Sequence, residues 1–358
     1  MRIVTVVGAR PQFIKAAVGS REIRKKHQEI LVHTGQHHDS NMSDIFFEEM
    51  EIPRPDYNLG IAGGSHGEMT GRMLIELEKV FLTENPNALL VYGDTNSTLA
   101  AALAAVKLQI PVIHCEAGNR THSLDNPEEV NRIVTDHVST RCLACTQSAL
   151  DFLQMENLGE RSTVIGDPMY DAFLYYGNRG GSVFRDVMDL SGNPVEVPSR
   201  YYYMTCHRQE NTNDPAILNE ILSAMETLDE PTIYPVHPRN RDTVLQFIRE
   251  GRFRNILFIQ PVGYLSSISF AKHAEKIVTD SGGVQREAFF AGKQCVTVLD
   301  IVAWPETMVN GCNRLAKPER ADILKKLSEP CRFDPAYQPF GDGHSAERLA
   351  KKIEELHS

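Results

Sequence analysis

Short apolar runs alternate with helix-like stretches along the chain, and this alternation constrains the fold more than any other feature. The runs that read as strands in the first half are RIVTVVG, EILVHTG, NALLVYGD, PVIHCEAG and RCLACTQ. Those in the second half are YYYMTCHR, PTIYPVHP, NILFIQPV, EKIVTDSGG and KQCVTVLD. Alternating strands and helices predict a parallel sheet with helices on both faces. We therefore predict an α/β protein with two Rossmann-like lobes, each built on a parallel sheet.

The chain is long enough for two such lobes. It has 358 residues, and a domain usually takes about 100–200. A stretch rich in Gly, Pro and Ser lies between the two sets of strands, near residues 168–198. We place the first lobe at residues 1–167 and the second at residues 168–344.

The end of the chain reads as a helix over residues 345–358. Ser345 stands where an N-cap belongs, and Leu349, Ile353 and Leu356 follow at helical spacing. The sequence therefore predicts a terminal helix with one apolar stripe.

Composition and charge narrow the function classes. A net charge of −10 argues against a nucleic-acid partner, because such proteins usually carry a basic face. No apolar run reaches the roughly 18 residues that span a bilayer, and the first residues are too polar after Val7 for a secretory signal. Seven scattered cysteines fit a reducing compartment. We expect a cytoplasmic protein without a membrane partner, in which Cys142 and Cys145 are two buried thiols.

Residues just after each strand are the first candidates for a site, because ligands of open parallel sheets bind beyond the strands' carboxyl ends. Gly8 follows the first strand, and Arg10 and Lys15 come at the start of the next helix. A glycine turn, a helix N-terminus and two cations suit a phosphate. Two solvated charges at a helix start are an equally good reading.

A stronger anion site follows the strand EKIVTD. Gly282 and Gly283 leave backbone N–H groups open to an anion at a helix N-terminus, and Ser281 can cap that helix. Glu287, two turns on, can accept the hydroxyls of a ribose. The alternative is an ordinary capped helix.

Three carboxylates fall at neighbouring strand or helix ends of the first lobe. Asp94 and Glu116 follow successive strands, and Glu128 lies in the first turn of the helix that begins at Pro127. Gathered like charges raise a pKa, which is how a general acid or base is made. For any one of these carboxylates alone, the more probable role is that of a helix N-cap.

Histidines at strand ends give a further signal. His207 and His237 end successive strands of the second lobe, where they can orient a diphosphate, transfer a proton or serve structure alone. Residue types that can bind a metal also gather at His33, His37, His38 and Asp39, but they lack the spacing of a known metal site. No GxGxxG or GxxxxGK[ST] motif follows the first strand. We expect neither a metal nor a redox cofactor.

Taken together, these motifs resemble the non-hydrolysing UDP-N-acetylglucosamine 2-epimerase family over essentially the full length. The matching elements are GARPQFIK, HTGQH, GDTNST, HCEAGNR, PEEVNR, TCHRQEN, PVHP, TDSGGVQREA and WPE. The resemblance implies the glycogen-phosphorylase-like (GT-B) fold, with the helix 345–358 packing back on the first lobe. It also implies a cytosolic homodimer that feeds surface-polysaccharide synthesis.

The family's reaction eliminates UDP as a proton leaves C2, giving a 2-acetamidoglucal, and re-adds UDP with the proton on the opposite face. By resemblance, the acid/base residues are Asp94, Glu116 and Glu128, and His207 helps to hold or activate the diphosphate. The positions that resemble the family's UDP-binding residues are Arg10, Lys15, Arg132, Ser281, Gly282, Gly283 and Glu287.

The sequence also departs from the family. The loop from Leu299 to Glu306 lacks the family's usual Arg, Thr and Glu, Asn119 replaces a Leu, and Asp39 stands where many members have an activator-site Gln. UDP-N-acetylglucosamine is the default substrate. Four other segments look more like a sub-branch that acts on UDP-2,3-diacetamido-2,3-dideoxyglucuronate: GGSHGEMTGRM, GDPMYDAFLYYG, HRQENTNDP and QPVGYLSS. The extra carboxylate of that substrate would need a cation, which Arg120 or His122 could supply. A hydrolysing epimerase, a glycosyltransferase and an inactive nucleotide-sugar sensor are the remaining readings.

Overall fold

The computed structural model describes residues 1–36, 49–177 and 187–356. It divides into two compact units, Met1–Tyr175 with Gln338–Ser358, and Tyr176–Tyr337. These bounds differ from the expected division at 167/168 and 344/345. The helix α7 (Pro168–Gly177) packs mostly with the first unit, where Leu174 contacts Gly343. The chain also returns to the first unit earlier than expected, before its last helix begins.

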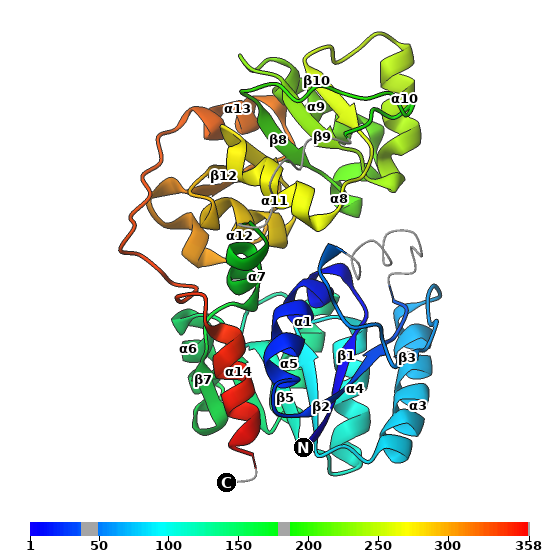
Figure 1. Ribbon diagram of the computed structural model, residues 1–358. Helices are drawn as coiled ribbons and strands as arrows, with labels where there is room; N and C mark the ends of the chain where they lie inside the picture. Colours follow the sequence, from blue (N-terminus) through cyan, green and yellow to red (C-terminus); the bar gives the residue numbers. More distant parts are fainter. Residues whose placement is uncertain (37–48, 178–186, 357–358) are drawn as a thin grey trace. The chain divides into compact units, whose positions relative to one another are not determined.

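The first unit is built on a seven-stranded sheet in the order β3-β2-β1-β4-β5-β6-β7, in which every pairing is parallel (Figure 1). Its strands are β1 (Arg2–Val7), β2 (Gln28–His33), β3 (Tyr57–Asn58), β4 (Ala88–Tyr92), β5 (Val112–Ala117), β6 (Arg141–Ala144) and β7 (Ser162–Val164). The predicted strands are all present. The strand β3 was not predicted, because two residues are too few to show a periodicity.

Helices cover both faces of this sheet, as Figure 1 shows. They are α1 (Arg10–Ile23), α3 (His66–Glu84), α4 (Asn96–Lys107), α5 (Pro127–Val138), α6 (Gln147–Met155) and α7, with α14 (Ser345–Glu354) from the end of the chain. The alanine-rich α4 lies against α3 and the strands, with Ala100, Ala101 and Ala105 fully buried. Small side chains let these elements approach closely, so the core here is dense.

The second unit repeats the plan with a six-stranded parallel sheet in the order β10-β9-β8-β11-β12-β13. Its strands are β8 (Tyr202–Thr205), β9 (Thr232–Pro235), β10 (Ile256–Ile259), β11 (Lys276–Thr279), β12 (Gln294–Thr297) and β13 (Asn313–Leu315). Its α-helices are α8 (Gln209–Thr212), α9 (Pro215–Glu226), α10 (Arg241–Arg249), α11 (Tyr264–His273), α12 (Gly282–Phe290) and α13 (Arg320–Ser328). The three-residue β13 was not predicted.

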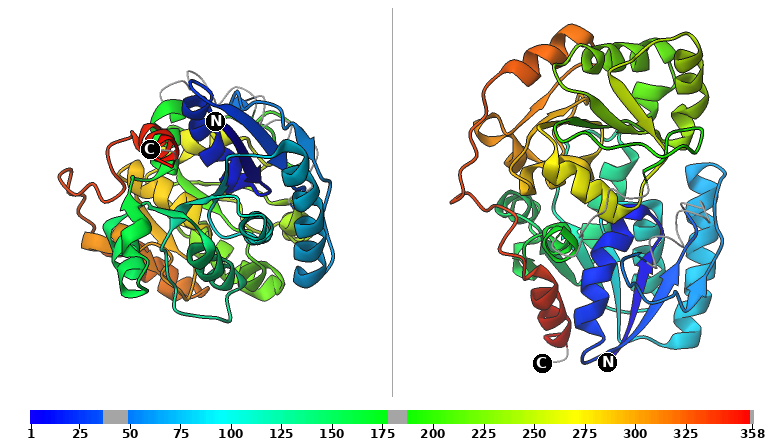
Figure 2. Two further views of the ribbon diagram at one scale, coloured as in Figure 1. Left: turned by 90° about the horizontal axis from the view of Figure 1, so that it is seen from below. Right: turned by 45° about the horizontal axis from the view of Figure 1, so that its top comes forward.

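The terminal helix α14 lies beside α1, as Figures 1 and 2 both show. The predicted apolar stripe is present, because Leu349 and Ile353 are fully buried. The predicted cap is wrong: the N-cap is His344, and Ser345 is the first helical residue. The helix ends at Glu354, short of the predicted residue 358.

Among the residues that the structure describes, no helix is both long enough and apolar enough to cross a membrane. Cys142 and Cys145 are both buried free thiols, as the sequence predicted. Burial raises the pKa of the Cys142 thiol to about 12, so this cysteine stays protonated and behaves as a small apolar side chain.

Candidate active site

Glu116 lies at the end of β5 in an unusual backbone conformation. Its φ is +70°, in the left-handed region that a residue with a side chain seldom adopts. The pairing with β6 shifts register between Cys115 and Ala117, so Glu116 forms a bulge. A strained residue of this kind persists only where its surroundings fix it, and such residues are frequent at functional sites.

Lys15 of α1 forms an ion pair with the Glu116 carboxylate, and both side chains are at least nine-tenths buried. Gly93, at the end of β4, has φ +63° and lies against the pair: a Cβ there would be 3.6 Å from Lys15 Nζ and 4.0 Å from Glu116 Oε1. The lysine predicted to hold a phosphate therefore contacts an acid/base candidate in this structure.

The turn before α1 is shaped by Gln12. The backbone N–H groups of Gly8 and Ala9 both donate to Gln12 Oε1, at 2.8 and 3.0 Å. A Cβ on Gly8 would lie 2.2 Å from Ser97 Oγ, so the glycine is needed for close packing. Two amides of this turn are thus already satisfied, and Arg10 lies half-exposed at the start of α1.

Asp94 is brought together with Arg132. The guanidinium of Arg132, on α5, pairs with Asp94 and with the buried Glu129. Burial alone would lower the pKa of Arg132, but Asp94, Glu129 and Glu116 raise it, so the charge is retained. Glu129 also accepts the backbone N–H groups of Thr121 and His122. It therefore serves to fix Arg132 and the loop after β5.

Glu128 is not part of this buried cluster. It lies exposed in the first turn of α5, where its backbone N–H donates to Asn126 Oδ1. The predicted Pro127 helix start is correct. The structure thus brings Asp94, Glu116, Lys15 and Arg132 together, and leaves Glu128 exposed.

A buried polar network supports the ends of β4 and β5. His114 lies 2.6 Å from both the Asp136 carboxylate and the Gly93 carbonyl oxygen, and Asp136 also accepts the Gly118 N–H. Arg120 pairs with Asp136 and with Glu156. Burial opposes the charge on Asp136, but His114 and Arg120 outweigh it and lower the pKa of that carboxyl.

The second unit carries the predicted anion site at the N-terminus of α12. Ser281 caps the helix by accepting the Val284 N–H at 3.4 Å, and Gly282 and Gly283 form its first turn. Glu287 is buried on the same helix. A nine-residue helix with two side-chain-free positions at its start suits a phosphate group.

His207 is held by Asp280, which directly precedes that helix. The imidazole Nδ1 lies 2.9 Å from one carboxylate oxygen, and the other oxygen accepts the backbone N–H groups of His207 and Arg208. The ring of His237 lies 5.8 Å from that of His207. Burial opposes ionisation of Asp280, but these hydrogen bonds lower its pKa to about 2. The carboxylate fixes which imidazole nitrogen faces outward.

We expect Asp280 to make the second unit acid-sensitive. Its pKa is about 2 in the folded protein against an ordinary 3.8, so its ionised form stabilises the fold above pH 4. That contribution, about 2 kcal/mol, is lost as pH falls toward 2. Urea unfolding at pH 5 and pH 3 checks this: Asp280→Asn should lose less stability relative to wild type at pH 3. An equal difference at both pH values would contradict it.

The altered loop packs on α12. The guanidinium of Arg286 lies 4.0 Å from the centre of the Trp304 ring, and Gln285 donates to Thr307 Oγ1 at 2.7 Å. A Cβ on Gly282 would lie 3.6 Å from the Trp304 indole nitrogen. In the loop where the family usually has Arg, Thr and Glu, this chain therefore has Trp304, which stacks with Arg286 and lies next to Gly282 at the start of α12.

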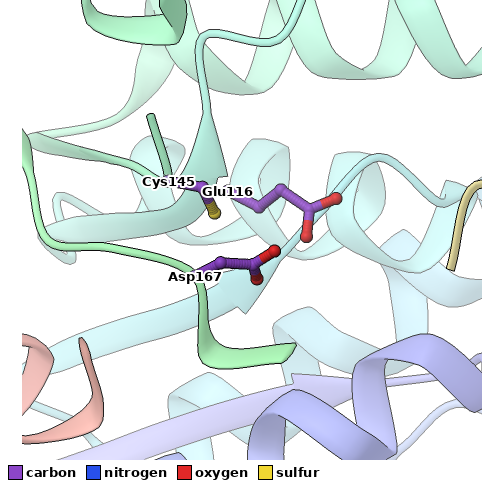
Figure 3. A group of neighbouring side chains, drawn as sticks. All are labelled: Glu116, Cys145 and Asp167. Carbon is purple, nitrogen blue, oxygen red and sulfur yellow. The ribbon is translucent and has the colours of Figure 1, made fainter. Parts of the chain in front are cut away.

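Asp167 follows β7 and is fully buried, and it was not among the predicted site residues. Glu116, Cys145 and Asp167 each present one potential ligand atom, and these atoms lie within 4.8 Å of one another (Figure 3). The rule that found Asp94 and Glu116 also applies to Asp167, since it ends the apolar run STVIGD. His33 packs against Phe13 in the core. His37, His38 and Asp39 lie outside the described residues.

Comparison with known proteins matches these features to one family. A family model for UDP-N-acetylglucosamine 2-epimerase matches residues 21–354. The UDP-2,3-diacetamido-2,3-dideoxy-D-glucuronate 2-epimerase of Pseudomonas aeruginosa is 43% identical over 99% of this chain and 100% of its own. The UDP-N-acetylglucosamine 2-epimerase of Methanococcus maripaludis is 38% identical over 98% of each chain.

Solved structures agree. The UDP-GlcNAc 2-epimerase of Methanocaldococcus jannaschii in complex with UDP-GlcNAc and UDP has a TM-score of 0.88 at 36% identity, covering 99% of this chain and 100% of its own. A lipopolysaccharide outer core galactosyltransferase, 11% identical with a TM-score of 0.54 over 99% of this chain and 100% of its own, shares the fold alone. The predicted α/β fold of GT-B type is therefore confirmed. The chain is an isomerase, a nucleotide-sugar 2-epimerase, and it belongs to the UDP-N-acetylglucosamine 2-epimerase family.

Proposed function

We propose that the substrate is UDP-2,3-diacetamido-2,3-dideoxyglucuronate, whose configuration at C2 the enzyme inverts. The observation that carries this choice is the 43% identity to the Pseudomonas epimerase of that name, over practically both full lengths. The relatives named UDP-N-acetylglucosamine 2-epimerase are 38% identical or less, and a Methanococcus maripaludis protein named a homolog of that enzyme is 42% identical. The Leu299–Glu306 loop, with its Trp304–Arg286 stack, also departs from the UDP-N-acetylglucosamine pattern.

The reaction requires a base that takes the C2 proton and an acid that returns it to the other face. As the proton leaves, the C2–H electrons form the C1–C2 double bond, and the C1–O bond breaks with its electrons on UDP. In the return step the C1–O bond to UDP re-forms, and a proton is delivered to C2 on the face opposite to the one it left. Glu116 and Asp94 are our candidates for this proton transfer, because an ion pair holds each in place, with Lys15 and with Arg132 respectively. Glu128, which is exposed, stays the third candidate for the acid/base role.

The departing UDP carries negative charge that must be stabilised. We assign its diphosphate to the N-terminus of α12 and to His207, whose orientation Asp280 fixes. Glu287 is our candidate for the ribose hydroxyls. Arg10 and Arg132 of the first unit keep the UDP-binding role that the resemblance implies.

The uronate carboxylate of the proposed substrate needs a cation or hydrogen-bond donors. The expectation that Arg120 supplies it is not supported, because Arg120 is buried and paired with Asp136 and Glu156. His122 is exposed, with its ring 5.1 Å from Phe152, and remains the candidate of the two.

UDP-N-acetylglucosamine is the second candidate substrate, favoured by the likeness to the Methanocaldococcus jannaschii epimerase solved in complex with UDP-GlcNAc and UDP. Proton NMR in D₂O with each nucleotide in parallel distinguishes the two. We expect the C2 proton signal to disappear and manno-configured peaks to appear with the diacetamido-uronate, at least about tenfold faster than with UDP-N-acetylglucosamine.

The reverse preference would replace the proposed substrate, and exchange with neither nucleotide would overturn both candidates. Free sugar plus UDP as products would indicate hydrolysis instead. A homodimer remains a prediction, which light scattering of the purified protein tests.

A further inference from the structure

A second carboxylate, Asp167, lies against Glu116 in the interior of the first unit. One oxygen of each carboxylate and Cys145 Sγ lie within 4.8 Å of one another, and all three side chains are buried. Figure 3 shows the two carboxylates side by side, with the cysteine sulfur next to Asp167. Asp167 belongs to neither the acid/base residues nor the UDP-binding residues assigned above.

The position of Asp167 is fixed by its neighbours. Its Oδ1 accepts the Met169 N–H at 2.9 Å, and its carbonyl oxygen accepts the Tyr170 N–H at 2.8 Å, so it caps α7. Its own N–H donates to the Phe340 carbonyl oxygen at 2.9 Å, which ties it to the returning end of the chain. A helix N-terminus favours a negative charge. These contacts hold the Asp167 carboxylate in place beside Glu116.

The charges that face Glu116 come from several elements. Lys15 from α1 pairs with it directly. Arg132 from α5 interacts with it while pairing with Asp94 and Glu129. Cys145 lies beside it after β6. Cys115 precedes it on β5, where burial raises the thiol pKa, so this group adds no charge.

Two opposite influences thus act on the Glu116 proton. The cations lower its affinity for a proton, whereas an ionised Asp167 at this distance raises it. Because the epimerisation is reversible, Glu116 acts as the base in one direction of the reaction and as the acid in the other, which works best when neither influence dominates.

We propose that Asp167 is a positioning residue for the epimerase reaction, whose negative charge offsets Lys15 and keeps Glu116 able to exchange a proton. This inference rests on the proposed role of Glu116. It predicts that the two carboxylates titrate as a coupled pair.

The test is the isosteric variant Asp167→Asn, whose amide oxygen can still accept the Met169 N–H. Removing the negative charge lowers the pKa of Glu116. The limb of the kcat–pH profile that depends on Glu116 should therefore move to lower pH, by about one to two pH units, with little change in KM. A lower kcat with every limb in place would mean a structural role only and would overturn the proposal.

Asp171→Asn is the matched control. Asp171 is a buried carboxylate on the same helix, and it accepts the Ala346 N–H at 2.8 Å instead of facing Glu116. This variant should leave the limb in place. A limb that moves equally in both variants would also overturn the proposal, because any buried charge in α7 would then have the effect.

A measurement without substrate separates this inference from the proposed function. Infrared titration of the folded protein, with Glu116→Gln spectra subtracted, isolates the Glu116 carboxyl band. Its midpoint should be lower in Asp167→Asn than in the parent. An unchanged midpoint refutes the inference and leaves the epimerase assignment intact, whereas failure of the parent enzyme on both nucleotides refutes the proposed function and leaves this titration unaffected.

Discussion

Glu116→Gln should lower the turnover of the epimerase by about 10²–10⁴-fold, the usual cost of removing a general acid or base. Glutamine keeps the shape of the side chain and can still accept a hydrogen bond from Lys15, but it cannot exchange the C2 proton. UDP affinity should remain within a few-fold, because the candidate diphosphate groups lie on α12 and at His207. C2 proton exchange in D₂O gives the turnover, and calorimetric titration with UDP gives the affinity.

Glu78→Gln is a suitable control for this experiment. Glu78 is exposed on α3, so its loss of charge should leave turnover unchanged. Circular dichroism of Glu116→Gln must match wild type, since Lys15 loses its charged partner in this variant. Full turnover in a folded Glu116→Gln would remove this residue from the acid/base set and transfer the role to Asp94 or Glu128.

Asp136→Ala should destabilise the first unit by about 3–5 kcal/mol, the range found when one partner of a buried charged network is removed. The variant leaves the buried Arg120 guanidinium without its buried partner and removes the acceptors of His114 and the Gly118 N–H. Urea unfolding followed by circular dichroism measures the change. Because His114 also contacts the Gly93 carbonyl oxygen, a folded fraction should lose turnover as well.

Asp342→Ala is the matched control for stability. Asp342 accepts two hydrogen bonds from Arg348, at 2.8 and 2.7 Å, but about half of each side chain is exposed. Exposed ion pairs contribute no more than about 1 kcal/mol. Equal losses in Asp136→Ala and Asp342→Ala would show that burial of the Asp136 network adds nothing.

The order of elements was readable from the sequence because each strand is a continuous apolar run that ends at a polar cluster. Parallel strands buried on both faces produce this pattern wherever they occur. The same regularity identified residues at strand ends, such as Asp94, Glu116 and His207, since a parallel sheet places these ends at one edge. The strands β3 and β13 were not predicted, because they are too short to produce a recognisable sequence pattern.

What the sequence determined by itself, then, is the α/β class, the strand-end candidates and the resemblance to the epimerase family. The tertiary structure decided which charges meet. Spacing along the chain could not reveal that Lys15 pairs with Glu116, or that Asp167, which follows β7, lies beside that carboxylate. Nor could it separate buried Glu129 from exposed Glu128, which are neighbours in sequence. The physical reason is that the effect of a charge depends on burial and on the distances to other charges, and both are fixed only when the strands and helices pack.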